Sequence, residues 1–423
     1  MKDILVLFPN EWDLAELGSP RYKGRYRFRY EGFDLFRFPE NLRLAAFDAR
    51  RFIDRVVARY RNEHLDGVIS NEEQWGALIA AVVTQRLGLP GADPRAILNA
   101  QHKFYARELL ARAVPEASPR YSAFPYDIRR AEDMGLPFPC FVKPVKATYS
   151  ILARRVDSFD DVRALMTFGP LESFILEKLI RPSEDLARDY GMHAATNSHN
   201  MIAEELLVGT QVTVEGVAVD GGVTIVGIVD AVMYPGTIAF QRFEYPSSVS
   251  SDVQARMADV ATRAIRALGF AHGMFNVELF HDPATDRVTI LEVNPRIAYQ
   301  FADLYEKVDG YNTYDAVLAL ATGEAPSLLR GNGRYRNAAS FVLRAFGRPR
   351  LKAFPDRKRI AALQRQYQDA KLMVYVKKGA QLDREVKWLG SYRYAVLNLG
   401  AMDVNQLVQR YHDVKGALAF EFA

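Results

Sequence analysis

The chain has 423 residues, of which 49% are hydrophobic and 25% are charged, and its formal net charge at pH 7 is +4. This composition is that of a globular protein with a sizeable core, and the length allows two or three domains. The small positive charge suits anionic small molecules but does not require nucleic acid as a partner, and the single cysteine, Cys140, excludes an intrachain disulfide framework.

The first apolar run, Ile4–Phe8, predicts a buried strand rather than a signal peptide, because no cleavage site follows it. No run in the sequence approaches the roughly 18 apolar residues that a membrane-spanning helix needs. Together with the single cysteine, these features predict a cytoplasmic protein.

Strand and helix patterns alternate through the first 95 residues. Ile4–Phe8, Phe33–Phe38 and Val68–Ser70 are expected to be strands, and Arg43–Arg61 and Trp75–Leu87 are expected to be helices. Alternation of this kind predicts a small, doubly wound parallel sheet. A turn-rich stretch of Gly and Pro near residues 88–94 ends this region.

Within this region, the segment Arg21–Tyr30 alternates cations with Tyr, Gly and Phe. Such a pattern occurs on surfaces that bind nucleic acid. It also fits a half-exposed strand or loop with its aromatic side chains inward and its cations in water, which is the reading that we favour.

Two lysines stand at the ends of predicted elements further along the chain. Lys103 opens a helical run with a partly apolar stripe that continues to Arg112. Lys143 ends the apolar strand that begins at Pro139, and a strand seldom buries a lysine unless an anion pairs with it. Either lysine, taken alone, fits a structural role as well as a ligand-binding one.

The next segments predict a strand with two acids, Glu204 and Glu205, within Met201–Gly216, and a helix over Val253–Leu268. Two apolar segments follow, Gly273–Phe280 and Val288–Arg296, and the polar break between them predicts a β-hairpin.

Glu278, Glu292 and Asn294 occupy even positions, so any even-sum register places them on one face of this hairpin. One such register sets Glu278 directly opposite Glu292. Facing carboxylates in an apolar environment repel each other and require a cation between them. Oxygen ligands of this kind suit Mg²⁺, with Mn²⁺ as an alternative.

The last part of the chain predicts three strands, Ala339–Phe346, Lys371–Lys377 and Tyr392–Leu399, and a helix over Asn405–Tyr411. We expect these elements to form a small α+β domain.

The pattern Glu278…Glu292-x-Asn294-x-Arg296 resembles the metal-binding signature of the ATP-grasp superfamily of carboxylate–amine ligases, in its biotin carboxylase-like and L-amino acid ligase-like branches. In that family, two glutamates and the asparagine hold two Mg²⁺ ions against the ATP phosphates. The resemblance returns in the family's order at Lys103, at Lys143, along residues 201–216 and, loosely, at Arg242.

The resemblance implies a nucleotide site in which Lys103 and Lys143 contact phosphates and Gln211 replaces the family's ribose-binding glutamate. The flap after Lys143 lacks the family's glycines, so Lys146 and nearby hydroxyl groups are expected to replace some of its phosphate contacts. The implied ATP-binding residues are Lys103, Lys143, Ser150, Glu204, Glu205, Leu207 and Gln211.

The resemblance also implies catalytic roles. Arg296 would orient the substrate carboxylate and stabilise the tetrahedral intermediate, and Arg242 would face the substrate. Glu278, Glu292 and Asn294 would hold the metal.

The predicted organisation has three parts. They are a Rossmann-like domain (1–95), an ATP-grasp domain (96–328) whose lid subdomain covers about 140–205, and a small C-terminal domain (329–423). We expect an ATP-dependent ligase that joins a small carboxylate, such as an amino acid, to an amine through an acyl phosphate, releasing ADP and phosphate. A homodimer is one expected assembly. The alternatives are a ligase that modifies a macromolecule, with Arg21–Arg29 as its docking surface, and a non-catalytic nucleotide-binding protein.

Overall fold

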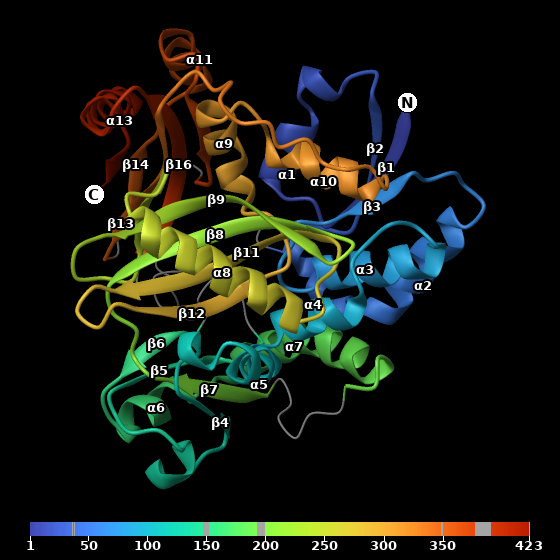
Figure 1. Cartoon of the computed structure of the whole chain (residues 1–423), viewed down its shortest axis with the longest axis vertical. Helices are drawn as coiled ribbons and strands as arrows, with labels where there is room; N and C mark the ends of the chain where they lie inside the picture. Colours follow the sequence, from blue (N-terminus) through green and yellow to red (C-terminus); the bar gives the residue numbers. More distant parts are fainter. Residues whose placement is uncertain are drawn as a thin grey trace.

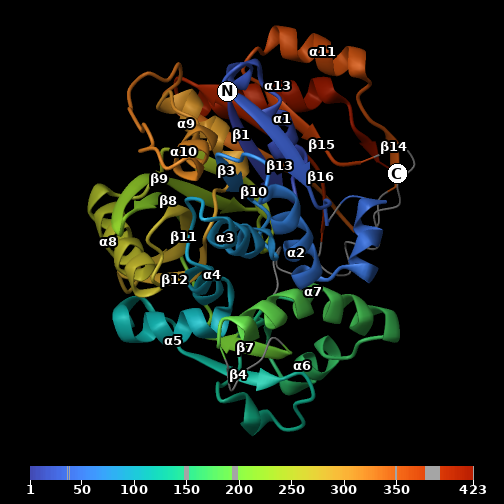
Figure 2. The same cartoon turned by 90° about the vertical axis from the view of Figure 1, so that its right-hand side faces the viewer.

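The computed structural model describes residues 1–35, 37, 39–146, 152–192, 199–347, 350–376 and 391–422. Figure 1 shows three sheets: a three-stranded N-terminal sheet, an eight-stranded central sheet and, at the lower end of the molecule, a four-stranded sheet. The four-stranded sheet is called the smaller sheet below. The C-terminal helices lie beyond the central sheet, at the opposite end from the smaller sheet (Figure 2).

The N-terminal sheet is parallel, with the strand order β2-β1-β3. Its strands and the helices of the same region are β1 (Lys2–Leu7), α1 (Glu11–Leu17), β2 (Tyr26–Glu31), α2 (Ala49–Tyr60), β3 (Gly67–Ile69) and α3 (Gly76–Leu87). The alternating pattern therefore predicted the parallel arrangement correctly.

One predicted strand is wrong. None of the described residues in the range Phe33–Phe38 belongs to a strand, and β2 instead uses Tyr26–Glu31 from the basic segment. The physical reason is that Phe33 is buried against the rings of Phe8 and Phe47, with ring centroids 5.8 and 5.4 Å apart, so this apolar stretch packs as a loop.

Three of the four arginines of the basic segment are paired with acidic side chains. Arg21 pairs with Glu306, Arg27 with Asp3 and Arg29 with Glu63. These pairs, together with the inward Tyr26 and Phe28 of the edge strand β2, fit the structural reading of the segment.

The helix predicted over Arg43–Arg61 is divided. A 3₁₀ helix covers Glu40–Ala46, and α2 begins only at Ala49. Asp48 causes this start, because its side chain accepts a hydrogen bond from the backbone N–H of Arg51 and caps the helix.

The central sheet is antiparallel and has the strand order β12-β11-β8-β9-β10-β13-β16-β15. Its strands are β8 (Thr210–Val219), β9 (Gly222–Met233), β10 (Phe240–Tyr245), β11 (Gly273–Asp282), β12 (Arg287–Asn294), β13 (Asn337–Phe346), β15 (Lys371–Val374) and β16 (Ser391–Ala401). Thus the strands on both sides of residue 328 share one sheet, and the division of the chain into domains at that point stays a prediction.

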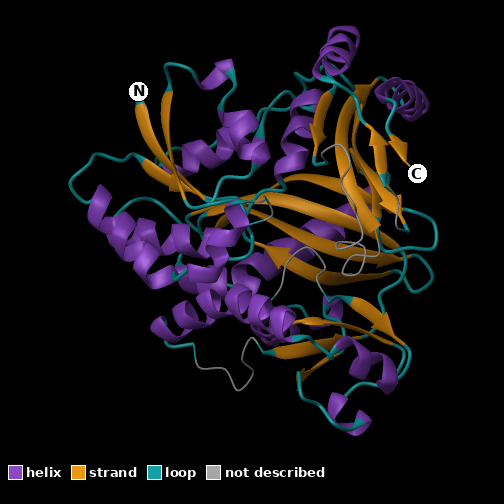
Figure 3. Cartoon of the chain, turned by 180° about the vertical axis from the view of Figure 1, so that it is seen from behind, coloured by secondary structure: helices purple, strands orange, loops and turns teal. Residues whose placement is uncertain are grey.

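Helices cover both faces of this sheet. One core cluster joins α8 (Ser251–Ala267) to β8 and β11, and another joins α9 (Ala302–Val308) and α10 (Thr313–Ala321) to β8 and β9. Seen from behind, the strands run as a continuous layer with helices beside it (Figure 3). No described helix is both long and apolar enough to span a membrane.

The smaller sheet is also antiparallel, with the order β4-β7-β5-β6. The elements of this region are α4 (Pro94–Gln101), α5 (Lys103–Ala113), β4 (Tyr121–Pro125), β5 (Cys140–Pro144), β6 (Arg154–Val156), α6 (Phe159–Leu165), α7 (Pro170–Asp189) and β7 (Asn200–Glu204). The remaining C-terminal elements are β14 (Leu351–Ala353), α11 (Arg357–Gln366), α13 (Val404–Leu418) and β17 (Glu421–Phe422).

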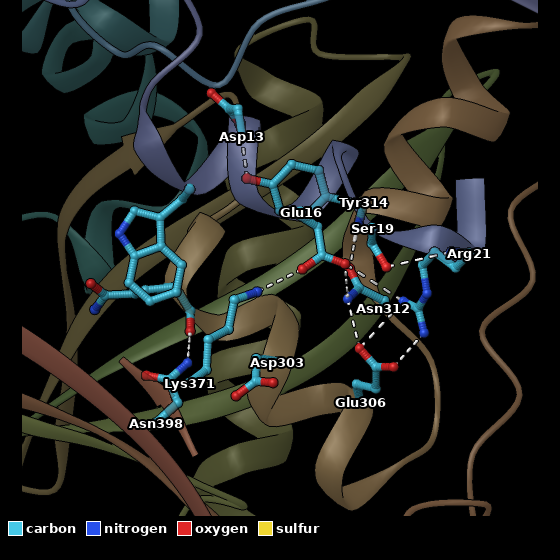
Figure 4. A network of polar contacts seen from close by, with 12 residues as sticks. Asp13, Glu16, Ser19, Arg21, Asp303, Glu306, Asn312, Tyr314, Lys371 and Asn398 are labelled. Carbon is cyan, nitrogen blue, oxygen red and sulfur yellow. Dashed lines mark hydrogen bonds and ion pairs between the residues drawn. The ribbon is translucent and has the colours of Figure 1, made fainter. Parts of the chain in front are cut away.

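A buried polar network joins α1 to the C-terminal half of the chain (Figure 4). Asp13 accepts hydrogen bonds from Asn71 Nδ2 and from the Tyr314 hydroxyl, both at 2.8 Å. Burial raises the pKa of Asp13. Glu16 accepts from Lys371 Nζ at 2.6 Å, so one short helix contacts both α10 and β15. This network fixes the position of the N-terminal sheet against the central sheet.

We predict that Tyr314→Phe lowers the free energy of unfolding by about 1–3 kcal/mol, because the buried carboxyl of Asp13 loses a donor. Urea denaturation measures this change. Tyr126→Phe is the matched control, because the buried hydroxyl of Tyr126 has no hydrogen-bond partner within the described part of the chain. Equal losses in the two variants would contradict the structural role of the network.

Candidate active site

The hairpin of β11 and β12 brings the predicted metal ligands together. Its register places Glu278 opposite Glu292 and Asn276 opposite Asn294, which confirms the predicted pairing. Asn294 Nδ2 donates to Asn276 Oδ1 at 3.0 Å and to Glu278 Oε1 at 3.3 Å. Gln211 Nε2, from the neighbouring β8, donates to Glu278 Oε2 at 2.9 Å. The two carboxyl groups and the amide therefore form one cluster.

The two glutamates of this cluster differ in their electrostatics. Burial, and then the charge of Glu292, raise the pKa of Glu278. Burial also opposes ionisation of Glu292, but Lys103, Lys143 and Arg296 outweigh it and lower the pKa of Glu292 below its ordinary value. The pair therefore favours one ionised and one protonated carboxyl group unless a further cation lies between them.

This cluster fits a magnesium site that is completed by a substrate. The described residues contain no group of three or more His, Cys, Asp and Glu that could hold a metal ion. Two carboxylates and one amide oxygen give only oxygen ligands, which Mg²⁺ prefers, and Mg²⁺ usually completes its shell with waters and substrate phosphates. The facing carboxylates supply the negative charge that such an ion would neutralise.

Lys143, at the end of β5, lies in a buried ionic cluster. Its Nζ is 2.7 Å from Glu204 Oε2, and Arg107 Nε is 2.6 Å from Glu204 Oε1. Although burial opposes ionisation, Arg107 and Lys143 lower the pKa of Glu204 to about 2. Both oxygens of this carboxylate therefore already have cationic partners.

Arg107 and Lys143 also contact the backbone of β12 in the hairpin of β11 and β12. Arg107 Nη2 donates to the carbonyl oxygen of Leu291 at 2.6 Å, and Lys143 Nζ lies 3.4 Å from the same oxygen. Leu291 immediately precedes Glu292, so the cluster ties the smaller sheet and α5 to β12. Our sequence interpretation did not single out Arg107. Its position four residues after Lys103, on the same face of α5, was the available signal.

Lys103 begins α5 and lies beside Glu292, in the cluster of Glu278, Glu292 and Asn294. Its Nζ is 3.8 Å from Glu292 Oε2, and its backbone N–H donates to the carbonyl of Val145 at 2.9 Å. The start of α5 is thereby tied to the residues that follow β5. The structure thus places both predicted phosphate-binding lysines next to Glu292.

The remaining residues of the predicted nucleotide site are Glu205, Leu207 and Ser150. Glu205 pairs with Arg120 at 3.0 Å and with Arg287 at 2.8 Å. Leu207 lies, partly buried, in the connection between β7 and β8. Ser150 lies outside the described residues. Their predicted contacts with ATP stay predictions.

Arg296 contacts Glu73 and the backbone of the following residue, Ile297. It forms an ion pair with Glu73, from the loop that follows β3, and its Nη1 donates to the carbonyl of Ile297 at 3.2 Å. The fully buried Glu215 supports the turn after Arg296, because its Oε1 accepts from the Ala298 N–H at 2.7 Å. Burial raises the pKa of Glu215 to about 7. Neither Glu73 nor Glu215 was predicted as a site residue, and each comes from a segment far away in the sequence.

The structure does not bring Arg242 to this centre. Arg242 lies on β10, which is separated from β11 by β8 and β9. There it pairs with Glu244 at 2.6 Å and donates to Gln241 Oε1 at 2.6 Å. Its predicted contact with the substrate stays a prediction.

Comparisons with known proteins agree with this arrangement. A family model described as the ATP-grasp domain matches residues 136–304. An uncharacterized protein of Sinorhizobium fredii, y4rH, is 26% identical over 319 residues, which cover 72% of this chain and 59% of that protein. Carnosine synthase 1 of Gallus gallus is 28% identical over 264 residues, covering 59% of this chain and 27% of the relative. The chain therefore spans less than two thirds of the length of these relatives.

Among solved structures, an L-amino acid ligase from Bacillus licheniformis superposes with a TM-score of 0.72 at 18% identity. The match covers 100% of this chain and 99% of that one, so the two proteins share their fold along their whole lengths.

We predict that Glu204→Gln lowers the free energy of unfolding by about 3–5 kcal/mol, because it leaves Arg107 and Lys143 buried without a counter-charge. Glu205→Gln is the control. Its partners Arg120 and Arg287 both have exposed guanidinium-bearing side chains, so a loss of about 1 kcal/mol or less is expected. Chemical denaturation of both variants measures the difference, and similar losses would contradict the importance of the buried cluster.

The stabilisation by Glu204 should depend on pH. Because its pKa is lowered from 4.5 to about 2, the ionised form stabilises the fold fully above pH 4.5 and loses this effect as the pH falls toward 2. The stability difference between the wild type and Glu204→Gln should narrow over that interval. A difference that stays constant from pH 6 to pH 2.5 would contradict the assigned ion pairs.

Proposed function

We propose that this chain, which carries an ATP-grasp domain and has an ATP-grasp fold, is a carbon–nitrogen ligase that joins the carboxylate of an amino acid to an amine and forms ADP and phosphate. The observation that carries this proposal is the opposition of Glu278 and Glu292 beside Asn294, with Lys103 and Lys143 adjacent to Glu292. Such a cluster suits the binding and transfer of a phosphoryl group, since it combines metal-binding oxygens with cations.

In this proposal, Glu278, Glu292 and Asn294 would hold Mg²⁺, or Mn²⁺, and the metal would neutralise negative charge on the ATP phosphates when bound. Lys103, beside Glu292, and Lys143, at the carbonyl of Leu291, would neutralise further phosphate charge. Neither role needs a side-chain nucleophile, because positioning and charge neutralisation dominate phosphoryl transfer.

The proposed reaction has two steps. A carboxylate oxygen of the substrate bonds to the γ-phosphorus, the bond from that phosphorus to the β,γ-bridging oxygen breaks, and ADP leaves. The amine nitrogen then attacks the acyl carbon, the carbon–oxygen bond to phosphate breaks, and phosphate leaves while the nitrogen loses its proton. The result is an amide.

Arg296 is the residue that we assign to the substrate carboxylate. Its planar guanidinium suits a carboxylate or an acyl phosphate. It lies two residues after the proposed metal ligand Asn294 and forms an ion pair with Glu73. An entering carboxylate would share or replace this ion pair.

An amino acid is proposed as the carboxylate on the strength of the fold shared with an L-amino acid ligase. A macromolecular substrate is less well supported, because Arg21, Arg27 and Arg29, which favoured it, are paired with acidic side chains. We keep the three-part domain division and the cytoplasmic location as parts of this proposal.

We predict that purified chain, Mg-ATP and a suitable pair of amino acids yield ADP and phosphate in a one-to-one ratio. The reason is that the proposed metal ligands and lysines surround the phosphate chain, leaving the γ-phosphoryl group to be transferred. Anion-exchange chromatography of the nucleotides, over a panel of amino-acid pairs, measures the products. Amine-dependent formation of AMP and pyrophosphate would refute the mechanism.

We predict that Glu292→Gln lowers turnover about a hundredfold or more, because a ligand of the proposed metal loses its charge. Asp282→Asn on the same hairpin is the control, since Asp282 lies partly exposed at the turn end of β11 and its substitution should leave turnover unchanged. Initial rates of phosphate release measure both variants. Normal turnover by Glu292→Gln would remove the basis for the metal assignment.

A further inference from the structure

Lys146 is a buried lysine that the site described above does not yet use. It lies two residues beyond the end of β5, and only 3% of its surface is exposed. Across the residues that the structure describes, its one hydrogen-bond partner is the side-chain oxygen of Gln101, at 3.2 Å. That partner is neutral, so the ammonium group is buried without a paired carboxylate.

Two carboxylates of the loop after β3, those of Glu72 and Glu73, already bind other groups. Glu72 accepts hydrogen bonds from the backbone N–H groups of Gln74, Trp75 and Gly76, at 2.8, 3.0 and 2.7 Å. Glu73 forms its ion pair with Arg296. The loop after β3 therefore supplies negative charge to this region but no direct ion pair to the lysine.

The pKa of Lys146 is also lowered, as expected for a buried ammonium group without a paired carboxylate. Burial, and then the charge of Lys103, lower the pKa of Lys146 to about 7, although Glu72, Glu73 and Glu292 oppose this shift. A buried cation is stable when an anion pairs with it. Among the described residues, no carboxylate therefore pairs directly with the ammonium group of Lys146.

The position of Lys146 indicates which anion would fit. Its partner Gln101 also donates from Nε2 to the carbonyl of Glu73 at 2.8 Å. Lys103 N–H binds the carbonyl of Val145, the residue before Lys146. Lys146 is thus linked through Gln101 to Glu73, which holds Arg296, and through Val145 to Lys103, which is next to Glu292.

We infer that Lys146 is a third phosphate-binding lysine, which contacts the γ-phosphoryl group while it passes from ATP to the substrate carboxylate. The inference rests on the proposed function, since it takes the phosphates to lie at Glu292 and the carboxylate to lie at Arg296. Because these contacts link Lys146 to both points, its ammonium donates to oxygens of the phosphoryl group that is transferred, whereas Lys103 and Lys143 serve the metal side. The sequence that follows Lys146 contains no glycine until well past this site. In this inference, the Lys146 side chain makes a phosphate contact that the backbone of a glycine-rich segment would otherwise make.

The test uses Lys146→Met in the full chain and compares two ligands, Mg-ADP and the magnesium complex of a non-hydrolysable β,γ-imido analogue of ATP. We expect affinity for the analogue to fall about tenfold or more, and affinity for ADP to change less than about twofold, by calorimetric titration. Equal affinities of the variant and the wild type for the analogue, or equal losses for both ligands, would overturn the inference.

Thermal unfolding supplies a second readout that separates ligand binding from a structural role. Replacing an unpaired buried ammonium by a methionine of similar length should leave the melting temperature unchanged or raise it. Lys307→Met is the matched control, because Lys307 is also buried, with 8% of its surface exposed, but pairs with Asp303 at 2.5 Å. That variant should lose stability and keep its affinity for the analogue. A large loss of stability in Lys146→Met, with the analogue's affinity preserved, would assign Lys146 a structural role.

The inference and the proposed function can fail separately. A wild type that binds the analogue through Lys146 but releases no ADP with any amino-acid pair would support the inference and contradict the amino-acid substrate. A wild type that forms ADP, with a variant that binds the analogue normally, would overturn only the inference.

Discussion

The repulsion between Glu278 and Glu292 is the constraint around which the centre of this protein is arranged. The register of β11 and β12 forces the two carboxyl groups to face each other, and the neighbouring strand places Gln211 against Glu278. Facing carboxylates in a partly buried position are unfavourable unless cations compensate them. Three cations from three different parts of the chain, Lys103, Lys143 and Arg296, provide part of this compensation.

Two of those cations, Lys143 and Arg296, are themselves held in place by ion pairs with other segments. Glu204 binds Lys143 and Arg107 together, and Arg107 reaches the backbone of β12 just before Glu292. Glu73 binds Arg296 from the N-terminal region. The smaller sheet, the N-terminal loop and the hairpin therefore meet at one charged centre, and a change in any of these ion pairs would be felt at the others.

The sequence predicted this centre because its main features depend on local patterns. The parity of positions 278, 292 and 294 was sufficient to predict a shared face, and the structure confirms both the register and the fold class. Lys103 and Lys143 open a helix and end a strand, but it was the resemblance to the ATP-grasp superfamily that singled them out as phosphate-binding residues. These signals lie within single elements, where periodicity and element ends can be read directly.

The residues that were missed depend on contacts between distant segments. Glu73 and Arg296 are 223 positions apart, and Arg107 and Glu204 are 97 apart, so no local pattern identifies either pair. The strand predicted at Phe33–Phe38 failed for a related reason, since Phe33 packs against the ring of Phe47 instead of joining the sheet. Similarly, the sheet continues through β13, β16 and β15 because of long-range pairing that the individual strand patterns do not contain.

The most direct test of the proposed chemistry follows the oxygen atoms of the substrate. An amino acid labelled with ¹⁸O in its carboxylate is incubated with the chain, Mg-ATP and an amine, and the released phosphate is analysed by mass spectrometry. If the carboxylate attacks the γ-phosphorus, as proposed for the site at Glu278, Glu292 and Arg296, one labelled oxygen appears in each phosphate released. Unlabelled phosphate accompanied by amide product, or label in AMP, would contradict an acyl phosphate intermediate.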